Sequence, residues 1–298
     1  MLDPRFGSPK TFGQILDHTF SLSKAKFKDF FLMMLIFLGP VYLLQAIIEM
    51  AMGVQFVREF SSMGGLFESF LYDYEDTAFT ATDIATVIAS MMSIFTAPLA
   101  FASILIAINH MRVGEEYQLS AVVKQAISRY GGLLGSTILF LIMVMTILFT
   151  TVFIVSIFTV TLSLANLITG ILIGILLFIG LFIGAGLLFT RWGFYFSTVV
   201  FREGMPGFTR SWRLTKGRTW TLFGIYFVFM IIISTINFAL GSTFGVLLGN
   251  SVLYSMIQNV VYLVTLTLFT VGYAVMFFDL KIRHDADDLK EMIDQYDE

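Results

Sequence analysis

The side chains suited to chemistry are few, and most of them gather between residues 191 and 220. Arg191 lies near the end of a long apolar stretch. Downstream, basic and indole side chains follow one another closely: Arg210, Trp212, Arg213, Lys216, Arg218 and Trp220. Such groups at a membrane interface are suited to contact with anionic lipid headgroups. We therefore expect lipid or headgroup contact at these residues, although the excess of positive charge on cytoplasmic loops alone explains the same pattern.

The elements that must position these side chains are membrane spans. The chain has 298 residues, of which 57% are hydrophobic and 13% charged, whereas an ordinary soluble domain carries about 25% charged residues. Six hydrophobic runs are long enough to cross a bilayer: residues 30–52, 84–108, 132–160, 167–190, 220–247 and 252–279. We therefore predict an all-α integral membrane bundle of six transmembrane helices, forming one polytopic membrane domain over residues 1–298.

The composition argues against most catalytic chemistry. Six spans leave no room for a separate soluble domain of ordinary size. The chain has no cysteine and three histidines, which excludes disulfides and thiol catalysis and argues against a metal centre. No set of nucleophile, base and metal ligands converges in the sequence. We therefore expect no enzyme activity, no metal and no cofactor.

The basic residues are distributed very unevenly between the two sides of the membrane. If the N-terminus is inside, the inner segments hold 17 of the 18 lysines and arginines, and the outer side holds Arg58 against seven acidic residues. Cytoplasmic segments carry the excess of positive charge. We therefore predict a plasma-membrane protein with both termini in the cytoplasm. The net charge of −3 hides this polarity and indicates no nucleic-acid partner.

A short amphipathic helix is predicted on the cytoplasmic side before each odd-numbered span. The three begin near Thr11, Ser120 and Pro206. The segment Phe20-Ser-Leu-Ser-Lys-Ala-Lys26 is similar to Trp212-Arg-Leu-Thr-Lys-Gly-Arg218. This favours a threefold internal repeat with an acidic tail, over residues 12–110, 119–202, 206–283 and 284–298. A shared need for a basic, aromatic approach to the membrane explains the similarity without duplication.

Small and bend-forming residues are placed for helix packing. Small residues four apart let helix backbones approach closely in lipid. They are Gly170, Gly174, Gly180 and Gly184 on the fourth span, and Gly241, Gly245 and Gly249 at the outer end of the fifth. Pro40 and Pro98 lie within the first and second spans, where each predicts a kink. Paired kinks either shape the bundle or line a cavity.

Polar groups within the spans are scarce. Glu49 is predicted to lie at the outer interface, near the end of the first span. Arg191 either snorkels to the inner interface or meets a buried partner such as Glu203, or an anionic headgroup. Gln258 and Asn259 on the sixth span are predicted to hydrogen-bond between helices.

Four stretches give the chain a resemblance to a known family. They are REGMPGFTRSWRLTKGRTWTLFG at residues 202–224, FGQILDHTFSL at residues 12–22, Arg191 about twelve residues before Glu203, and DLKIRHDADDL at residues 279–289. Together they resemble the polytopic membrane-domain family named after glycerophosphodiester phosphodiesterase membrane domains. The resemblance implies a stand-alone bacterial member that lacks the catalytic domain, and it implies no specific activity.

Two functions fit these observations. The first is a non-enzymatic accessory or scaffold subunit of a membrane assembly, with contacts to anionic lipids and a membrane-protein partner. The alternative is a transporter, or a carrier of lipid or anionic solute, with a cavity between the kinked first and second spans and the fourth. A polar cavity that reaches the middle of the membrane would favour the carrier.

Overall fold

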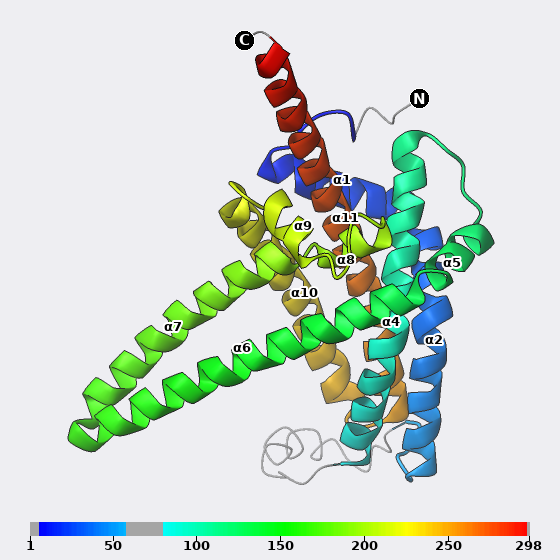
Figure 1. Cartoon of the computed structure of the whole chain (residues 1–298). Coiled ribbons are helices and arrows are strands. Elements are labelled where there is room, and N and C mark those ends of the chain that lie inside the picture. Colours follow the sequence, from blue (N-terminus) through cyan, green and yellow to red (C-terminus); the bar gives the residue numbers. More distant parts are fainter. Residues whose placement is uncertain (1–5, 58–79, 297–298) are drawn as a thin grey trace. The chain divides into compact units, whose positions relative to one another are not determined.

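The structure is a computed structural model that describes residues 6–57 and 80–296, with side chains as far as residue 284. All regular secondary structure within these residues is helical (Figure 1). Six of the described helices are long and apolar enough to cross a membrane. They are α2 (Phe27–Ala51), α4 (Ala81–Val113), α6 (Tyr130–Ala165), α7 (Leu167–Trp192), α10 (Thr219–Leu248) and α11 (Val252–Tyr296). The all-α prediction with six spans is confirmed, and the protein is an integral membrane protein.

A short helix precedes each odd-numbered span, as predicted. These helices are α1 (Phe12–Ala25), α5 (Leu119–Ile127) and α9 (Phe208–Leu214), and a further short helix, α8 (Tyr195–Val200), follows α7. With α8 set aside, the order of the described helices is short, long, long three times. Repeat ancestry stays a prediction, because an order of elements does not establish a duplication.

Two of these helices begin close to the predicted residues and differ in their first turn. The helix α5 begins at Leu119 after Gln118, so Ser120, which its side chain suggests as the N-cap, lies inside the helix. Pro206 precedes α9, which begins at Phe208 after Gly207. The physical reason is that Gly207 adopts a left-handed φ of +88°, so the helical conformation cannot extend back through it to Pro206.

The chain divides into two compact units, each described by itself. Unit 1 comprises residues 13–128 and 228–275, together with the N-terminal end of the chain, and contains α2, α4, α5 and parts of α10 and α11. The α2 and α4 helices pack along each other. Gly272 on α11 admits the ring of Phe229 from α10, because a Cβ there would lie 2.4 Å from the ring.

Backbone hydrogen bonds close the end of unit 1 at which α11 begins. The amides of Val252 and Leu253 donate to the carbonyls of Gln55 and Phe56 at 3.1 and 3.0 Å. These bonds satisfy first-turn amides of α11 that would otherwise lack partners inside the helix. The segment after α2 is thereby tied to the start of the sixth span. The remainder of the predicted outer loop, residues 58–79, lies outside the described residues.

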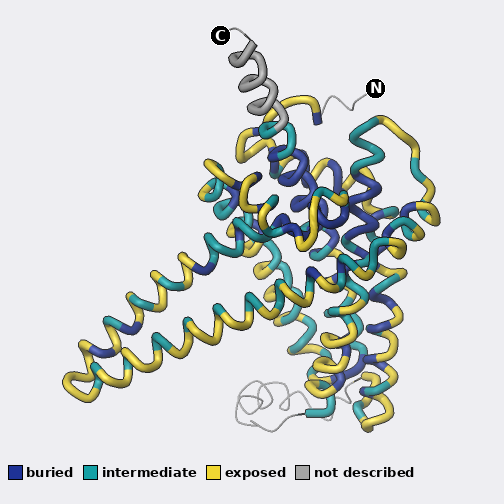
Figure 2. The backbone as a smooth tube through the Cα atoms, in the orientation of Figure 1, coloured by how far each residue is buried: buried dark blue, intermediate teal, exposed yellow. Residues whose placement is uncertain are grey.

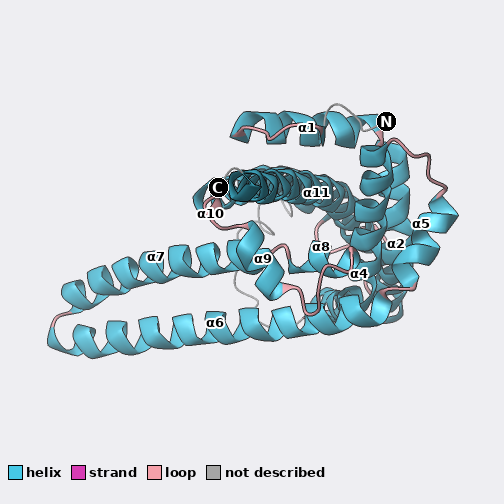
Figure 3. Cartoon of the chain, turned by 45° about the horizontal axis from the view of Figure 1, so that its top comes forward, coloured by secondary structure: helices cyan, strands magenta, loops and turns pink. Residues whose placement is uncertain are grey.

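Unit 2 comprises residues 7–12, 129–227 and 276–298. Its α6 and α7 form an antiparallel hairpin (Figures 1 and 3). At the turn the Asn166 side chain accepts a hydrogen bond from the Thr169 amide at 3.1 Å, which caps the start of α7. Figure 2 shows that both helices are exposed along most of their length. An apolar, exposed surface of this kind suits contact with lipid.

The glycines predicted for packing lie in different surroundings. A Cβ on Gly170 or Gly174 would lie 2.1 Å from Ser163 Oγ or 2.2 Å from Thr159 Oγ1 of α6, whereas Gly180 and Gly184 face open space. On α10, Gly241 and Gly245 lie against Gln258 and Tyr254, and Gly249 takes a positive φ of +54° after the helix ends. Pro40 and Pro98 lie inside α2 and α4, which continue through them.

Candidate headgroup-binding site

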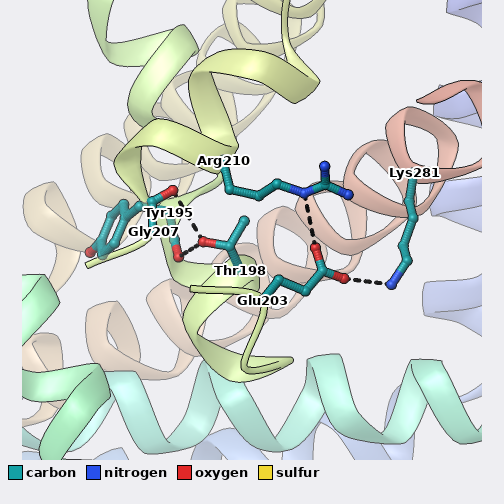
Figure 4. Close-up of polar contacts among 6 residues, drawn as sticks. All are labelled: Tyr195, Thr198, Glu203, Gly207, Arg210 and Lys281. Atoms are coloured by element: carbon teal, nitrogen blue, oxygen red, sulfur yellow. Dashed lines mark hydrogen bonds and ion pairs between the residues drawn. The ribbon is translucent and has the colours of Figure 1, made fainter. Parts of the chain in front are cut away.

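A tight loop between α8 and α9 orders the segment that follows Arg191. A Cβ on Gly207 would lie 2.3 Å from Thr198 Oγ1 and 2.6 Å from the Tyr195 carbonyl oxygen. The space is occupied because the Thr198 hydroxyl shares its proton between the carbonyls of Tyr195, at 2.7 Å, and Gly207, at 3.2 Å (Figure 4). Glycine at this position therefore permits both the left-handed φ and the close approach.

Glu203 in this loop bridges two basic residues. Its Oε2 lies 3.5 Å from Arg210 Nε, and its Oε1 accepts a hydrogen bond from Lys281 Nζ at 2.5 Å (Figure 4). The side chains of all three are largely buried, with exposed fractions between 16% and 27%. Among the described residues Glu203 pairs with Arg210 and Lys281, and no ion pair joins it to Arg191.

A second acidic residue holds the two ends of unit 2 together. Asp279, with 2% of its side chain exposed, accepts a hydrogen bond from the Lys10 amide at 2.6 Å and pairs with Arg283 Nε at 3.0 Å. Arg283 in turn donates from Nη2 to the Lys10 carbonyl at 2.7 Å. Partial burial lowers the pKa of Arg218, and the positive charge of Arg283 adds to this effect while Asp279 opposes it. Arg218 therefore belongs to this cluster.

Arg191 lies in an open groove formed by α7, α9 and the start of α10. Its guanidinium carbon lies 4.4 Å from the centroid of the Trp212 ring, and its Nε donates to Thr219 Oγ1 at 3.2 Å. The groove has a volume of about 400 Å³, within the range of small-ligand sites. It is lined by Gly184, Leu187, Leu188, Arg191, Trp212, Gly217, Thr219, Trp220 and Thr221.

Hydrogen bonds from a buried serine place α9 beside Arg191. The Ser211 hydroxyl donates to the Arg191 carbonyl at 2.6 Å and accepts from the Phe194 amide at 3.0 Å. Because Ser211 and Trp212 are neighbours on α9, these bonds bring the indole over the guanidinium. The two contacts explain how an arginine on the fourth span meets a tryptophan about twenty residues downstream.

The structure separates the predicted contact residues into groups. Arg191, Trp212 and Trp220 line the groove, with Trp220 67% exposed. Arg213 and Lys216 are exposed and lie outside the groove lining. Arg210 pairs with Glu203, and Arg218 lies near Asp279 and Arg283. One basic segment of the sequence thus serves both a groove and the internal support of the loop.

Sequence reasoning missed the roles of Glu203, Lys281, Asp279 and Arg283. The signal was present, because these residues lie in the stretches that carry the family resemblance. Among the described residues, no group of three or more histidine, aspartate or glutamate side chains is placed to hold a metal ion. Comparisons with protein-family models, with curated proteins and with solved structures give no match.

Proposed function

We propose that this chain is a non-enzymatic protein of the plasma membrane that serves as an accessory or scaffold subunit of a membrane assembly. In this proposal both termini are cytoplasmic, and the groove around Arg191 binds the headgroup of an anionic phospholipid. The observation that supports it best is the position of one guanidinium in an open groove between two indoles and a leucine-lined helix.

The contacts of Arg191 suit phosphate recognition. Its Nε is engaged by Thr219 and one face is covered by Trp212, whereas Nη1 and Nη2 make no hydrogen bond to the described residues. A guanidinium fixed in this way presents a planar pair of donors to a phosphate. Leu187 and Leu188 line the same groove and offer an apolar surface for the lipid's glycerol and upper acyl chains.

Replacement of Arg191 tests the groove. We expect Arg191→Leu to insert and fold normally but to retain roughly one tenth of the bound phosphatidylglycerol, because one charge-assisted hydrogen bond contributes about 1.5–3 kcal/mol. The measurement is native mass spectrometry of the full-length protein, purified in mild detergent and titrated with phosphatidylglycerol or phosphatidylcholine.

The matched control keeps the groove and removes exposed charge. In the double variant Arg213→Gln, Lys216→Gln the groove lining is intact, so retention of phosphatidylglycerol is expected to stay close to wild type. Equal losses in the two variants would show that general positive charge, and not the groove, holds the lipid.

The scaffold role is tested separately by purifying the tagged protein from its native membranes. A stoichiometric membrane-protein partner supports the accessory role. An enriched anionic solute or lipid, with no such partner, would favour the carrier.

We also propose that the chain belongs to the polytopic membrane-domain family that it resembles. Two of the resembling stretches contact each other, since Lys281 of residues 279–289 pairs with Glu203 of residues 202–224.

A further inference from the structure

A carboxyl group is fully buried in unit 1. Glu49 lies near the end of α2, and its exposed fraction is 0%. Its Oε1 accepts a hydrogen bond from Gln45 Nε2 at 3.0 Å, and the same nitrogen lies 3.2 Å from Thr86 Oγ1 of α4. Asn259 of α11 donates to Gln45 Oε1 at 3.0 Å. Three spans therefore enclose the acid in a polar cluster.

Within residues 6–57 and 80–284, no positively charged side chain pairs with the cluster. None of the ion pairs among the described residues involves Glu49. The basic residues of α2 and α4 lie at the opposite ends of those helices, at Lys28 and Arg112, and residues 228–248 and 252–275 carry none. A buried carboxylate without a counter-ion is costly, so the group must be neutralised.

The other groups that face Glu49 are neutral as well. Ser255 of α11 lies close to the carboxyl, and Tyr42 of α2 lies beside Tyr262 of α11. Asp83, near the start of α4, is exposed and makes its hydrogen bonds with Thr80. None of these residues carries a positive charge that could neutralise the Glu49 carboxylate.

Along α2, the polar side chains that begin at Glu49 and Gln45 end at Tyr42. Tyr42 lies seven residues before Glu49, about 10 Å along the helix, beside Ser93 and Tyr262. One and two turns further along the helix, the buried residues include the apolar Leu38 and Met34. A stripe that stops at apolar side chains suits binding of a small ion from one side and does not provide a path across the membrane.

We propose that Glu49 is a proton-binding site at the end of the first, second and sixth spans. The carboxylate takes one proton from the adjacent aqueous side, –COO⁻ + H⁺ giving –COOH, and returns it to the same side. Because Oε1 accepts the Gln45 hydrogen bond, Oε2 carries the proton. Uptake neutralises the buried charge, so protonation stabilises the packed arrangement of α2, α4 and α11 around the acid.

The test is reaction of the full-length protein, in phosphatidylcholine vesicles, with the hydrophobic reagent dicyclohexylcarbodiimide. This reagent modifies protonated carboxyl groups in apolar surroundings, and mass spectrometry of peptides locates the adduct. We expect an adduct at Glu49 that decreases as the pH rises, no adduct at this position in Glu49→Gln, and an unchanged yield in Asp83→Asn, which removes an exposed acid near the same end of the unit.

Two results would overturn the proposal. If sodium chloride suppresses the adduct at constant pH and choline chloride does not, a metal cation neutralises Glu49. If no adduct forms, infrared difference spectra of wild type and Glu49→Gln are compared. If the wild type shows no protonated-carboxyl band beyond those of the variant, Glu49 is charged and the proposal is wrong. An infrared band that depends on Glu49 supports the proposal even where the reagent cannot enter. The pH dependence of the adduct and its response to sodium chloride are both measured on the wild type, so they remain informative even if Glu49→Gln folds poorly.

Discussion

Glu203 and Glu49 show how the same type of side chain takes different roles when the charges around it differ. Glu203 lies between Arg210 and Lys281, whose charges balance its own. Glu49 lies among amides and hydroxyl groups. The first is held in fixed ion pairs that support a loop, whereas no ion pair among the described residues neutralises the second.

At Glu203 we predict a loss of stability without loss of insertion. Glu203→Gln leaves Arg210 and Lys281 without a counter-charge and is expected to reduce the free energy of unfolding by about 1–3 kcal/mol. Thermal unfolding in detergent measures the change. Glu115→Gln is the control, since Glu115 is 63% exposed in its contact with His110 and a surface change of this kind is worth within about 0.5 kcal/mol. Equal shifts in melting temperature would contradict the prediction.

Gly207 gives a second prediction at this scale. Gly207→Ala forces a side chain into a positive φ and into contact with Thr198 Oγ1 and the Tyr195 carbonyl, so we expect the loop to shift and the melting temperature to fall. Gly13→Ala is the matched control, because a Cβ there meets nothing within 4 Å. A stable Gly207→Ala variant with unchanged headgroup binding would refute the role of this glycine.

At the scale of the elements, the sequence predicts the helices well and their lateral partners poorly. Hydropathy is a property of the linear sequence. The six predicted spans agree with the six described helices, and most of their first and last residues differ by only a few positions. The partners of Arg191 and Glu49 depend on which helices pack side by side, which hydropathy does not encode. Glu49, predicted at the outer interface, lies near the end of α2 and is enclosed by protein, which the sequence does not indicate. Asn259 does bond between helices, as predicted, whereas Gln258 bonds to Tyr254 of its own helix.

The α6–α7 hairpin gives a prediction with an internal control. A Cβ on Gly170 would lie 2.5 Å from the Ser163 backbone nitrogen, which cannot rotate away, so Gly170→Ala is expected to destabilise the hairpin by about 1–3 kcal/mol. Gly180 lies on the same helix in open space, so Gly180→Ala is expected to be neutral. Thermal unfolding of the two variants compares them directly, and a ranking in the opposite order would show that the helices are not in contact at Gly170.

At the scale of the whole molecule, the distribution of charge predicts the topology. The chain has no native cysteine, so single introduced cysteines report their side without background. The basic segments and the acidic outer loop predict opposite accessibility for the two sides.

We predict that a cysteine at Gly65 is labelled by an impermeant maleimide from outside intact cells and that one at Thr209 is not. Thr209 is exposed on α9 and serves better than Gly207, where a side chain would disturb the loop. Labelling at Thr209 after permeabilisation is the control. The reverse pattern would overturn the predicted orientation of both termini.

The length of α6 has a consequence for the membrane in which the protein works. With 36 residues, the helix is about 54 Å long, whereas the hydrocarbon layer of a bilayer is roughly 30 Å thick. Tilt alone, which averages about 20°, does not absorb this excess, so part of the hairpin must extend beyond the acyl chains or thicken them. A thick bilayer relieves this mismatch at lower cost than a thin one, so acyl-chain length becomes a determinant of where the protein accumulates.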